Sequence, residues 1–237
     1  MSSVLSGSGH CRFGGRAMLD PGTAWPECGG VPLSLFAVLD LDVLAPWLGD
    51  LVPDGTGVLN FFYLDGHSDL AAPAAVERAL EFALDAPEVG AVVPARPGLA
   101  AETDAPGGCS VFASVAWTVS PGFAFPDDYD PAWDVLGAGT DAVRDYIATW
   151  NPDSDWPERP GALYSTDLAF GWPAFPTGSA SGFPDAEASR AHQHLLQLSE
   201  QDDWHMGGDG GWMHWSIPVE ALRAGDFRGA VPTPDYW

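Results

Sequence analysis

Four histidines near the C-terminal end of the chain have types and spacing that suit a metal or ligand site. His192 and His194 lie two residues apart, so both side chains face the same side if the segment is a strand. His205 and Asp209 follow in a glycine-rich stretch, and His214 lies in the next apolar run. Imidazole and carboxylate groups are the usual ligands of zinc and non-haem iron. These five residues are therefore candidate ligands of a divalent metal, and such a site requires that three or more of them converge.

An ordinary β-hairpin accounts for the same segment without a metal. Residues 192–198 and 212–217 are two largely apolar runs, and the connection between them is rich in Asp and Gly. Asp and Gly are what a tight connection between strands needs. The connection has enough carboxylates for calcium but lacks the ligand spacing of an EF-hand loop. In this alternative the histidines are partly exposed or hydrogen-bonded to neighbours.

Eleven tryptophans are more than a chain of 237 residues usually contains. Tryptophan in a loop often marks a ligand or partner surface, because its ring buries a large area on binding. The candidates for such a surface are Trp156, Trp172, Trp204 and Trp212. Core filling is the alternative for all of them, and we expect it for Trp25 and Trp215.

No familiar catalytic motif is present. There is no G-x-S-x-G elbow, and the absence of lysine excludes Schiff-base catalysis and a P-loop. Cys109 follows two glycines, and a histidine elsewhere could activate it, although a structural role is the simpler interpretation. Whether the protein is an enzyme stays open at this level.

The chain is strongly acidic, with 33 Asp and Glu, nine Arg and a formal net charge of −24. Nucleic acids and anionic membranes are bound through basic residues, so neither is an expected partner. The charge could attract a basic protein or peptide, or it could simply keep the protein soluble. No apolar run approaches the ~20 residues that span a bilayer, and residues 1–9 do not resemble a signal peptide. The three cysteines are widely spaced, which favours a cytoplasmic, reduced protein.

The 22 Pro and 28 Gly residues favour many short elements joined by tight turns. Besides the hairpin, apolar or alternating runs predict strands over residues 33–39, 57–64, 90–94 and 110–119. Helical spacing of apolar residues predicts helices over 73–84, 141–150 and 219–223. The predicted fold is a single α+β domain dominated by mostly antiparallel sheet.

An internal repeat would divide this domain into two related halves. Residues 35–42 followed by 57–62 resemble residues 195–202 followed by 211–215. Each pair has an apolar strand, an acidic turn, a glycine and a strand that ends in aromatic residues. Hairpins in general look alike, so two copies are weak support for a repeat.

Two parts of the chain resemble the YwqG-like family, a group of bacterial proteins classed as a domain of unknown function. The N-terminal resemblance rests on Phe13-Gly14-Gly15, Pro21-Gly22, Trp25-Pro26, Leu35-Phe36-Ala37 and residues 57–62. The C-terminal resemblance rests on residues 195–198, Gly208-Asp209-x-Gly211, Glu220-Ala221-Leu222 and Asp226-Phe227. One such domain would span residues 1–237, with family-like segments over 11–64 and 161–228 and a divergent middle over 65–160. The resemblance implies an α+β fold rich in antiparallel sheet, and it implies no activity.

The chain departs from the family pattern at four places. Val38 stands where the family usually has Gln, and Gly207 where it often has Trp. His194 replaces the usual Leu, and His214 replaces an aromatic residue. Two departures thus fall on histidine, so a ligand that the family binds there would differ in this chain.

Two functions from different classes follow. The first is a non-enzymatic acidic binding or accessory protein, such as an immunity factor, that engages a basic protein or peptide. The net charge and the loop tryptophans favour it. The second is a small-molecule enzyme or ligand-binding protein whose site is the histidine-rich hairpin. The first leads narrowly, because no catalytic motif is present.

Overall fold

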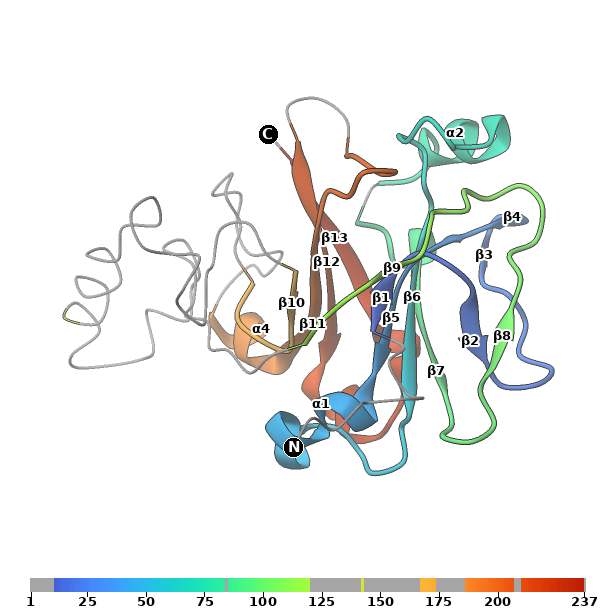
Figure 1. Ribbon diagram of the computed structural model, residues 1–237. Helices are drawn as coiled ribbons and strands as arrows, with labels where there is room; N and C mark the ends of the chain where they lie inside the picture. The colour runs from blue at the N-terminus through green and yellow to red at the C-terminus, as the bar shows by residue number, and fades with distance from the viewer. Residues whose placement is uncertain are drawn as a thin grey trace.

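The computed structural model describes residues 11–83, 85–119, 142, 167–173, 186–206 and 210–236. Two antiparallel sheets face each other within these residues (Figure 1). The N-terminal sheet has the order β7 (Gly90–Ala95), β6 (Val58–Tyr63), β5 (Ser34–Asp40), β1 (Arg12–Phe13) and β9 (Val115–Ala116). The C-terminal sheet has the order β10 (Leu168–Ala169), β11 (His192–Ser199), β12 (Gly211–Pro218) and β13 (Val231–Tyr236). The expectation of a fold rich in antiparallel sheet with a few short helices is confirmed.

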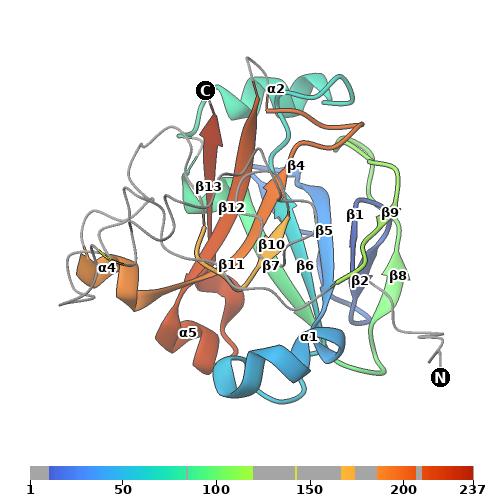
Figure 2. The ribbon, with the colours of Figure 1, turned by 60° about the vertical axis from the view of Figure 1, so that its left-hand side comes forward.

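Shorter elements surround the two sheets. A ribbon of β2 (Ala17–Leu19) and β8 (Ala101–Thr103) covers the outer face of the N-terminal sheet, and β3 (Glu27–Cys28) pairs with β4 (Val31–Pro32). The helices and 3₁₀ turns are α1 (Leu41–Leu48), η1 (Gly49–Leu51), α2 (Pro73–Ala79), η2 (Pro87–Val89), α4 (Ala186–Ala191), α5 (Val219–Arg223) and η5 (Phe227–Gly229). α2 lies at one end of the sheets, and α1 and α5 lie at the other (Figure 2). None of the described helices is long and apolar enough to cross a membrane.

The core lies between the two sheets. Every residue of β5 and β6 is buried, because both faces of these strands are covered, and their sequences are accordingly continuous apolar runs. The ring of Trp215 lies 5.5 Å from that of Phe61 and 6.1 Å from that of Phe36. Its indole nitrogen donates a hydrogen bond to the Phe62 carbonyl at 3.4 Å, which ties the C-terminal sheet to the N-terminal one. The expected core role of Trp215 is therefore observed.

The strands of the two sheets pair in the same register. In the N-terminal sheet, Asn60 of β6 pairs with Val38 of β5 and Val93 of β7. In the C-terminal sheet, His214 of β12 pairs with Gln197 of β11 and Thr233 of β13. Strand by strand, β1, β5, β6 and β7 thus correspond to β10, β11, β12 and β13. Each of the two sheets also has a 3₁₀ turn before the corresponding edge strand, η2 before β7 and η5 before β13.

A β-bulge occurs at the same point in both sheets. The pairing of β5 with β6 skips Phe36, and the pairing of β11 with β12 skips Leu195. The register therefore makes Leu35 equivalent to His194. The repeat expected from the sequence had matched Leu35 with Leu195, which is wrong by one residue for this strand. Its match of residues 57–61 with 211–215 agrees with the observed register.

The backbone after the first strand of each sheet is equivalent as well. Gly14 and Phe170 both have a φ of 59°. Their amides donate to the carbonyls of the two bulged residues, Phe36 at 2.8 Å and Leu195 at 3.2 Å. A Cβ on Gly14 would lie 2.6 Å from the Ala113 carbonyl oxygen, so this turn of the N-terminal sheet requires glycine. Phe170 is the one non-glycine residue with a positive φ in the described part of the chain, a conformation that costs about 1–2 kcal/mol.

Several expected elements differ from those observed. The helix predicted over 73–84 ends at Ala79 in α2. The strand predicted over 110–119 is reduced to β9, where Val115 is exposed, and in the segment before it Val111 is exposed and Phe112 is buried. The hairpin of β11 and β12, the strands over 33–39, 57–64 and 90–94, and the helix at 219–223 are confirmed. The helix predicted over 141–150 lies outside the described residues, except for residue 142.

Candidate functional site

The outer face of the C-terminal sheet is both polar and buried. Cross-strand pairing places His194 opposite Ser216 and Gln197 opposite His214, on the face that points away from Trp215. These four polar residues are buried, as is Asp235 of the neighbouring strand β13. Polar groups are costly to bury unless they find partners, so a polar face inside a small protein needs an explanation. This face is the candidate site.

His194 and His214 form its centre. The Nδ1 atom of His214 lies 3.4 Å from the Nε2 atom of His194, and the ring centroids are 5.6 Å apart. The two residues are 5% and 1% exposed. Burial lowers the pKa of His194 from 6.5 to about 3, although the nearby carbonyls of Gly171 and Leu196 act in the opposite direction. Burial, and then the neighbouring His194, lower the pKa of His214 well below 6.5, so both rings are neutral at pH 7.

The other proposed metal ligands do not join this pair. His192 is half-buried, and its Nδ1 atom lies 2.8 Å from the Ala188 carbonyl oxygen in α4. His205 is exposed, and Asp209 lies outside the described residues. Among the residues that the structure describes, no three His, Cys, Asp or Glu side chains form a group that could hold a metal ion. Two of the five predicted ligands therefore converge.

The acidic connection between β11 and β12 has structural partners. The backbones of Gln201 and Trp204 exchange two hydrogen bonds of 2.9 and 3.0 Å, which close a tight turn around Asp202 and Asp203. The Asp203 carboxylate accepts a 3.0 Å bond from the amide of Ala113 in the segment before β9. This part of the connection thus has the turn role that its Asp residues suggested.

The proposed binding tryptophans lie in different environments. Trp204 is 2% exposed, and its ring packs edge-on against Phe36 at 4.9 Å, so it belongs to the core. Trp212 is buried on the outer face of the C-terminal sheet, 6.5 Å from the ring of His214. Trp172 is half-buried, and Trp156 lies outside the described residues. Trp212 thus lies beside the histidine pair.

Cys109 lacks the environment of a reactive thiol. Burial raises its pKa above 9.0, which disfavours the thiolate that a nucleophile needs. Its Sγ atom donates to the carbonyl of Pro106 at 3.4 Å. Cys11 and Cys28 are buried, and burial raises the pKa of each of them as well. All three cysteines are free thiols, as expected from their spacing.

An exposed apolar surface on α2 was not expected. The helical spacing of Val76 and Leu80 predicts a buried face, but α2 buries Ala75 alone, and Leu80 is 85% exposed. Leu70, in the turn before the helix, is also exposed. Val76 and Leu80 are four residues apart and so lie on one side of the helix, and exposed apolar residues that lie together can bind a partner. We call Leu70, Val76 and Leu80 the α2 surface.

A buried polar cluster near α2 was also not expected. The Asp65 carboxylate accepts hydrogen bonds from the amides of His67 and Ser68 and from the hydroxyls of Ser68 and Ser110. The Ser110 amide in turn donates to the Ser34 hydroxyl at 2.9 Å. These bonds fix the turn before α2 to the segment before β9. The only sequence signal for them is an Asp followed three residues later by Ser.

The N-terminal part of the chain matches a known family. A family described as a domain of unknown function (DUF1963) matches residues 11–89, about a third of the chain. The matched region contains strands β1 to β6 and ends with η2, just before β7. No curated protein matches the chain. The chain is thus similar to a domain of unknown function over most of its N-terminal sheet.

Proposed function

We propose that the protein is an acidic binding or accessory module that engages a basic, amphipathic segment of a partner protein through the α2 surface. The observation that carries this proposal is the exposure of Leu70, Val76 and Leu80 within an acidic stretch of a strongly acidic protein. Two features support it: five arginines are paired with carboxylates, and exposed carboxylates border the apolar residues of the α2 surface.

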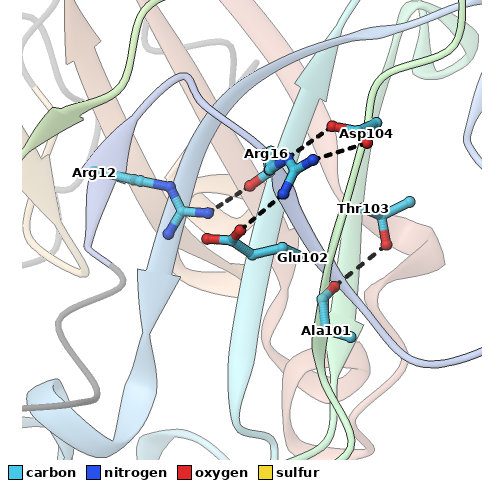
Figure 3. A network of polar contacts seen from close by, with 6 residues as sticks. All are labelled: Arg12, Arg16, Ala101, Glu102, Thr103 and Asp104. Carbon is cyan, nitrogen blue, oxygen red and sulfur yellow. Dashed lines mark hydrogen bonds and ion pairs between the residues drawn. The ribbon is translucent and has the colours of Figure 1, made fainter.

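Five of the arginines whose side chains the structure describes form ion pairs with carboxylates. Figure 3 shows Arg16 between Glu102 and Asp104, with an Nε–Oδ1 distance of 2.7 Å to Asp104. Arg12 in the same figure is buried, and it donates to the carbonyl of Arg16. The remaining exposed arginines with described side chains each form an ion pair: Arg78 with Glu81, Arg96 with Asp20, Arg223 with Glu220 and Arg228 with Asp226.

Such surface ion pairs contribute little stability. Because they neutralise these arginines, the remaining surface charge is negative. With 33 carboxylates and nine arginines, every local pair leaves further carboxylates uncompensated. An acidic surface accelerates encounter with a basic partner and repels acidic ones. The electrostatic field of the protein therefore favours a cationic partner, but it does not determine where that partner binds.

The α2 surface is the proposed binding site. Exposed carboxylates border its apolar residues, with Asp69 next to Leu70 and Glu77 next to Val76. Arg78 does not offset them, because its guanidinium donates to Glu81 at 2.5 Å and to the Gly29 carbonyl at 3.2 Å. A partner segment that covers this surface needs apolar side chains flanked by Lys or Arg. A short amphipathic basic helix has this chemistry.

A peptide titration tests the proposal. The probe is a synthetic helix of Leu and Lys, with a Leu and Glu peptide of the same length as its counterpart. The Leu/Lys peptide should bind, more tightly at low salt, and Leu80→Ser should weaken binding about tenfold or more, as expected for the loss of one buried leucine.

The matched control is Leu99→Ser, which removes an apolar residue that is 46% exposed in the connection between β7 and β8. It should leave the affinity unchanged. Equal weakening by both substitutions, or equal binding of both peptides, would contradict the proposed surface.

A further inference from the structure

The N-terminal sheet ends in an edge strand that lacks the features which usually prevent further pairing. β9 pairs with β1 on one side, and no strand of the described residues pairs with its other side (Figure 2). An open edge can pair with another strand, so most proteins protect it with proline, charge or a bulge. The edge strands β7 and β13 contain such prolines, Pro94 in β7 and Pro232 and Pro234 in β13. Residues 110–119 contain neither proline nor a charged residue, although the chain has a net charge of −24.

The backbone of β9 has hydrogen-bonding groups that point away from the sheet. The Trp117 amide donates to the Cys11 carbonyl, just before β1, at 2.9 Å. In an antiparallel pair the backbone groups of alternate residues point towards the partner strand, so those of Val115 do so as well. The N–H and C=O groups of Ala116, which lies between these two residues, therefore point outward. By the same alternation, residues 114–118 present outward groups at their first, middle and last positions.

This edge is also open to solvent. Residues 114–116 and Thr118 are exposed, and Val115 is exposed by 45%. The open stretch begins after Ala113, because the amide of that residue already donates to the Asp203 carboxylate at 3.0 Å. A fully extended strand of five residues can therefore lie along the outer side of β9.

The sequence of this edge is self-complementary. The residues Ser114-Val115-Ala116-Trp117-Thr118 are symmetric in type about the central alanine. When two copies pair antiparallel about a two-fold axis at Ala116, each Ser114 faces a Thr118 and each Val115 faces a Trp117. Pairs of hydroxyl residues and pairs of an aromatic with a β-branched residue are favourable across strands. The outward N–H and C=O groups of the two Ala116 residues then bond to each other.

We propose that two copies of this chain pair through β9 and form a symmetric dimer in which two five-stranded sheets become continuous. The self-complementary edge favours a second copy over a strand of another protein. The lack of charge along residues 110–119 supports the same choice, because two strongly acidic chains can touch here without bringing like charges into contact. The proposal does not depend on the α2 surface or on a basic partner.

Sedimentation equilibrium of the full chain, from micromolar to near-millimolar protein, tests the dimer. Salt should strengthen dimerisation, because each copy has a net charge of −24 and salt screens the repulsion between them. Peptide binding at the α2 surface should weaken with salt, so the two interactions respond in opposite directions. Hydrogen exchange adds a local measurement: the outward amides within residues 114–118 should exchange more slowly as the protein concentration rises.

Two substitutions at Ala116 locate the interface. Ala116→Glu places two carboxylates opposite each other across the two-fold axis, and it should weaken the dimer at least about tenfold. Ala116→Pro removes the outward amide and leaves the bonds to β1 in place, so it should weaken the dimer as well. Ala45→Glu is the matched control, since it adds the same charge at an exposed alanine of α1, and it should dimerise nearly as the wild type does.

Circular dichroism verifies that each variant is folded, and Ala116→Pro keeps the test valid if Ala116→Glu does not fold. Weakening by both substitutions at Ala116, with little effect of Ala45→Glu, supports the dimer. Equal weakening by Ala116→Glu and Ala45→Glu, or a dimer that neither substitution at Ala116 affects, overturns it. A wild-type protein that stays monomeric at high protein and high salt also overturns it, and leaves the edge to a strand of another protein. None of these results requires the Leu/Lys peptide, so each proposal can be contradicted on its own.

Discussion

Asn60 and His214 occupy equivalent positions in two sheets that have the same strand pairing. Each lies at the centre of a row of paired residues, on the outer face of the strand next to the edge strand β7 or β13. Asn60 uses its amide to hold the β2 ribbon, whereas His214 faces a second histidine. One residue is therefore part of the scaffold, and its equivalent belongs to the candidate site.

Asn60→Leu should destabilise the protein by about 2–4 kcal/mol, because it leaves the buried amide and carbonyl of Met18 without partners. Urea unfolding measures this change. Val93→Ala, which trims a half-buried side chain from the same row, should cost about 1 kcal/mol or less. Equal costs for the two substitutions would show that the Asn60 side chain is not an anchor.

Gly14→Ala and Phe170→Gly should have unlike effects, although both residues have a φ of 59°. The alanine at position 14 meets the Ala113 carbonyl as well as an unfavourable φ, so a loss of at least about 2 kcal/mol is expected. At position 170, relief of about 1–2 kcal/mol of backbone strain offsets the lost ring contacts. Thermal unfolding compares them, and a greater loss for Phe170→Gly would contradict the strain argument.

Acid should destabilise the protein through His194. The pKa of His194 is about 3 in the folded protein, whereas an exposed histidine has a pKa of 6.5. Between pH 3 and 6.5 the unfolded chain therefore binds a proton that the folded chain does not. Stability therefore falls as the pH decreases from 6.5 towards 3, by up to about 1.4 kcal/mol per pH unit for this one group. The His194→Leu variant should show a shallower decline in urea unfolding across that range. An unchanged slope would mean that the ring is accessible to water.

Cys109 should be the first thiol to be alkylated in the folded protein, yet it should react more slowly than free cysteine at pH 7.5. The reason is that it is half-buried and its pKa is raised, whereas Cys11 and Cys28 are buried. Mass spectrometry after a timed iodoacetamide pulse gives the order. Rapid modification of Cys109 at neutral pH would point to an activated thiol instead.

Sequence patterns predicted the strands well because they depend on local periodicity. The runs that became β5 and β6 are almost entirely apolar, as strands covered on both faces usually are, whereas β11 and β12 have an apolar run on one face only. The period of two also explains why His194 and His214 share a face. The repeat was out of register by one residue in its first strand, because the bulges at Phe36 and Leu195 have no sequence signature.

The composition of the site was less predictable. Nothing in the spacing of His192 shows that its ring lies against Ala188 in α4. The α2 surface was missed for a related reason, since the spacing of Val76 and Leu80 is the same whether a helix face is buried or open. Burial is a tertiary property, and local patterns report it only indirectly.

The most direct test of the proposed function is hydrogen–deuterium exchange of the full chain with and without the Leu/Lys peptide. Binding at the α2 surface predicts slower exchange in residues 69–80, and unchanged exchange in the connection between β7 and β8, where Leu99 lies. Protection spread evenly over the molecule, or confined to another element, would contradict a binding module that works through α2.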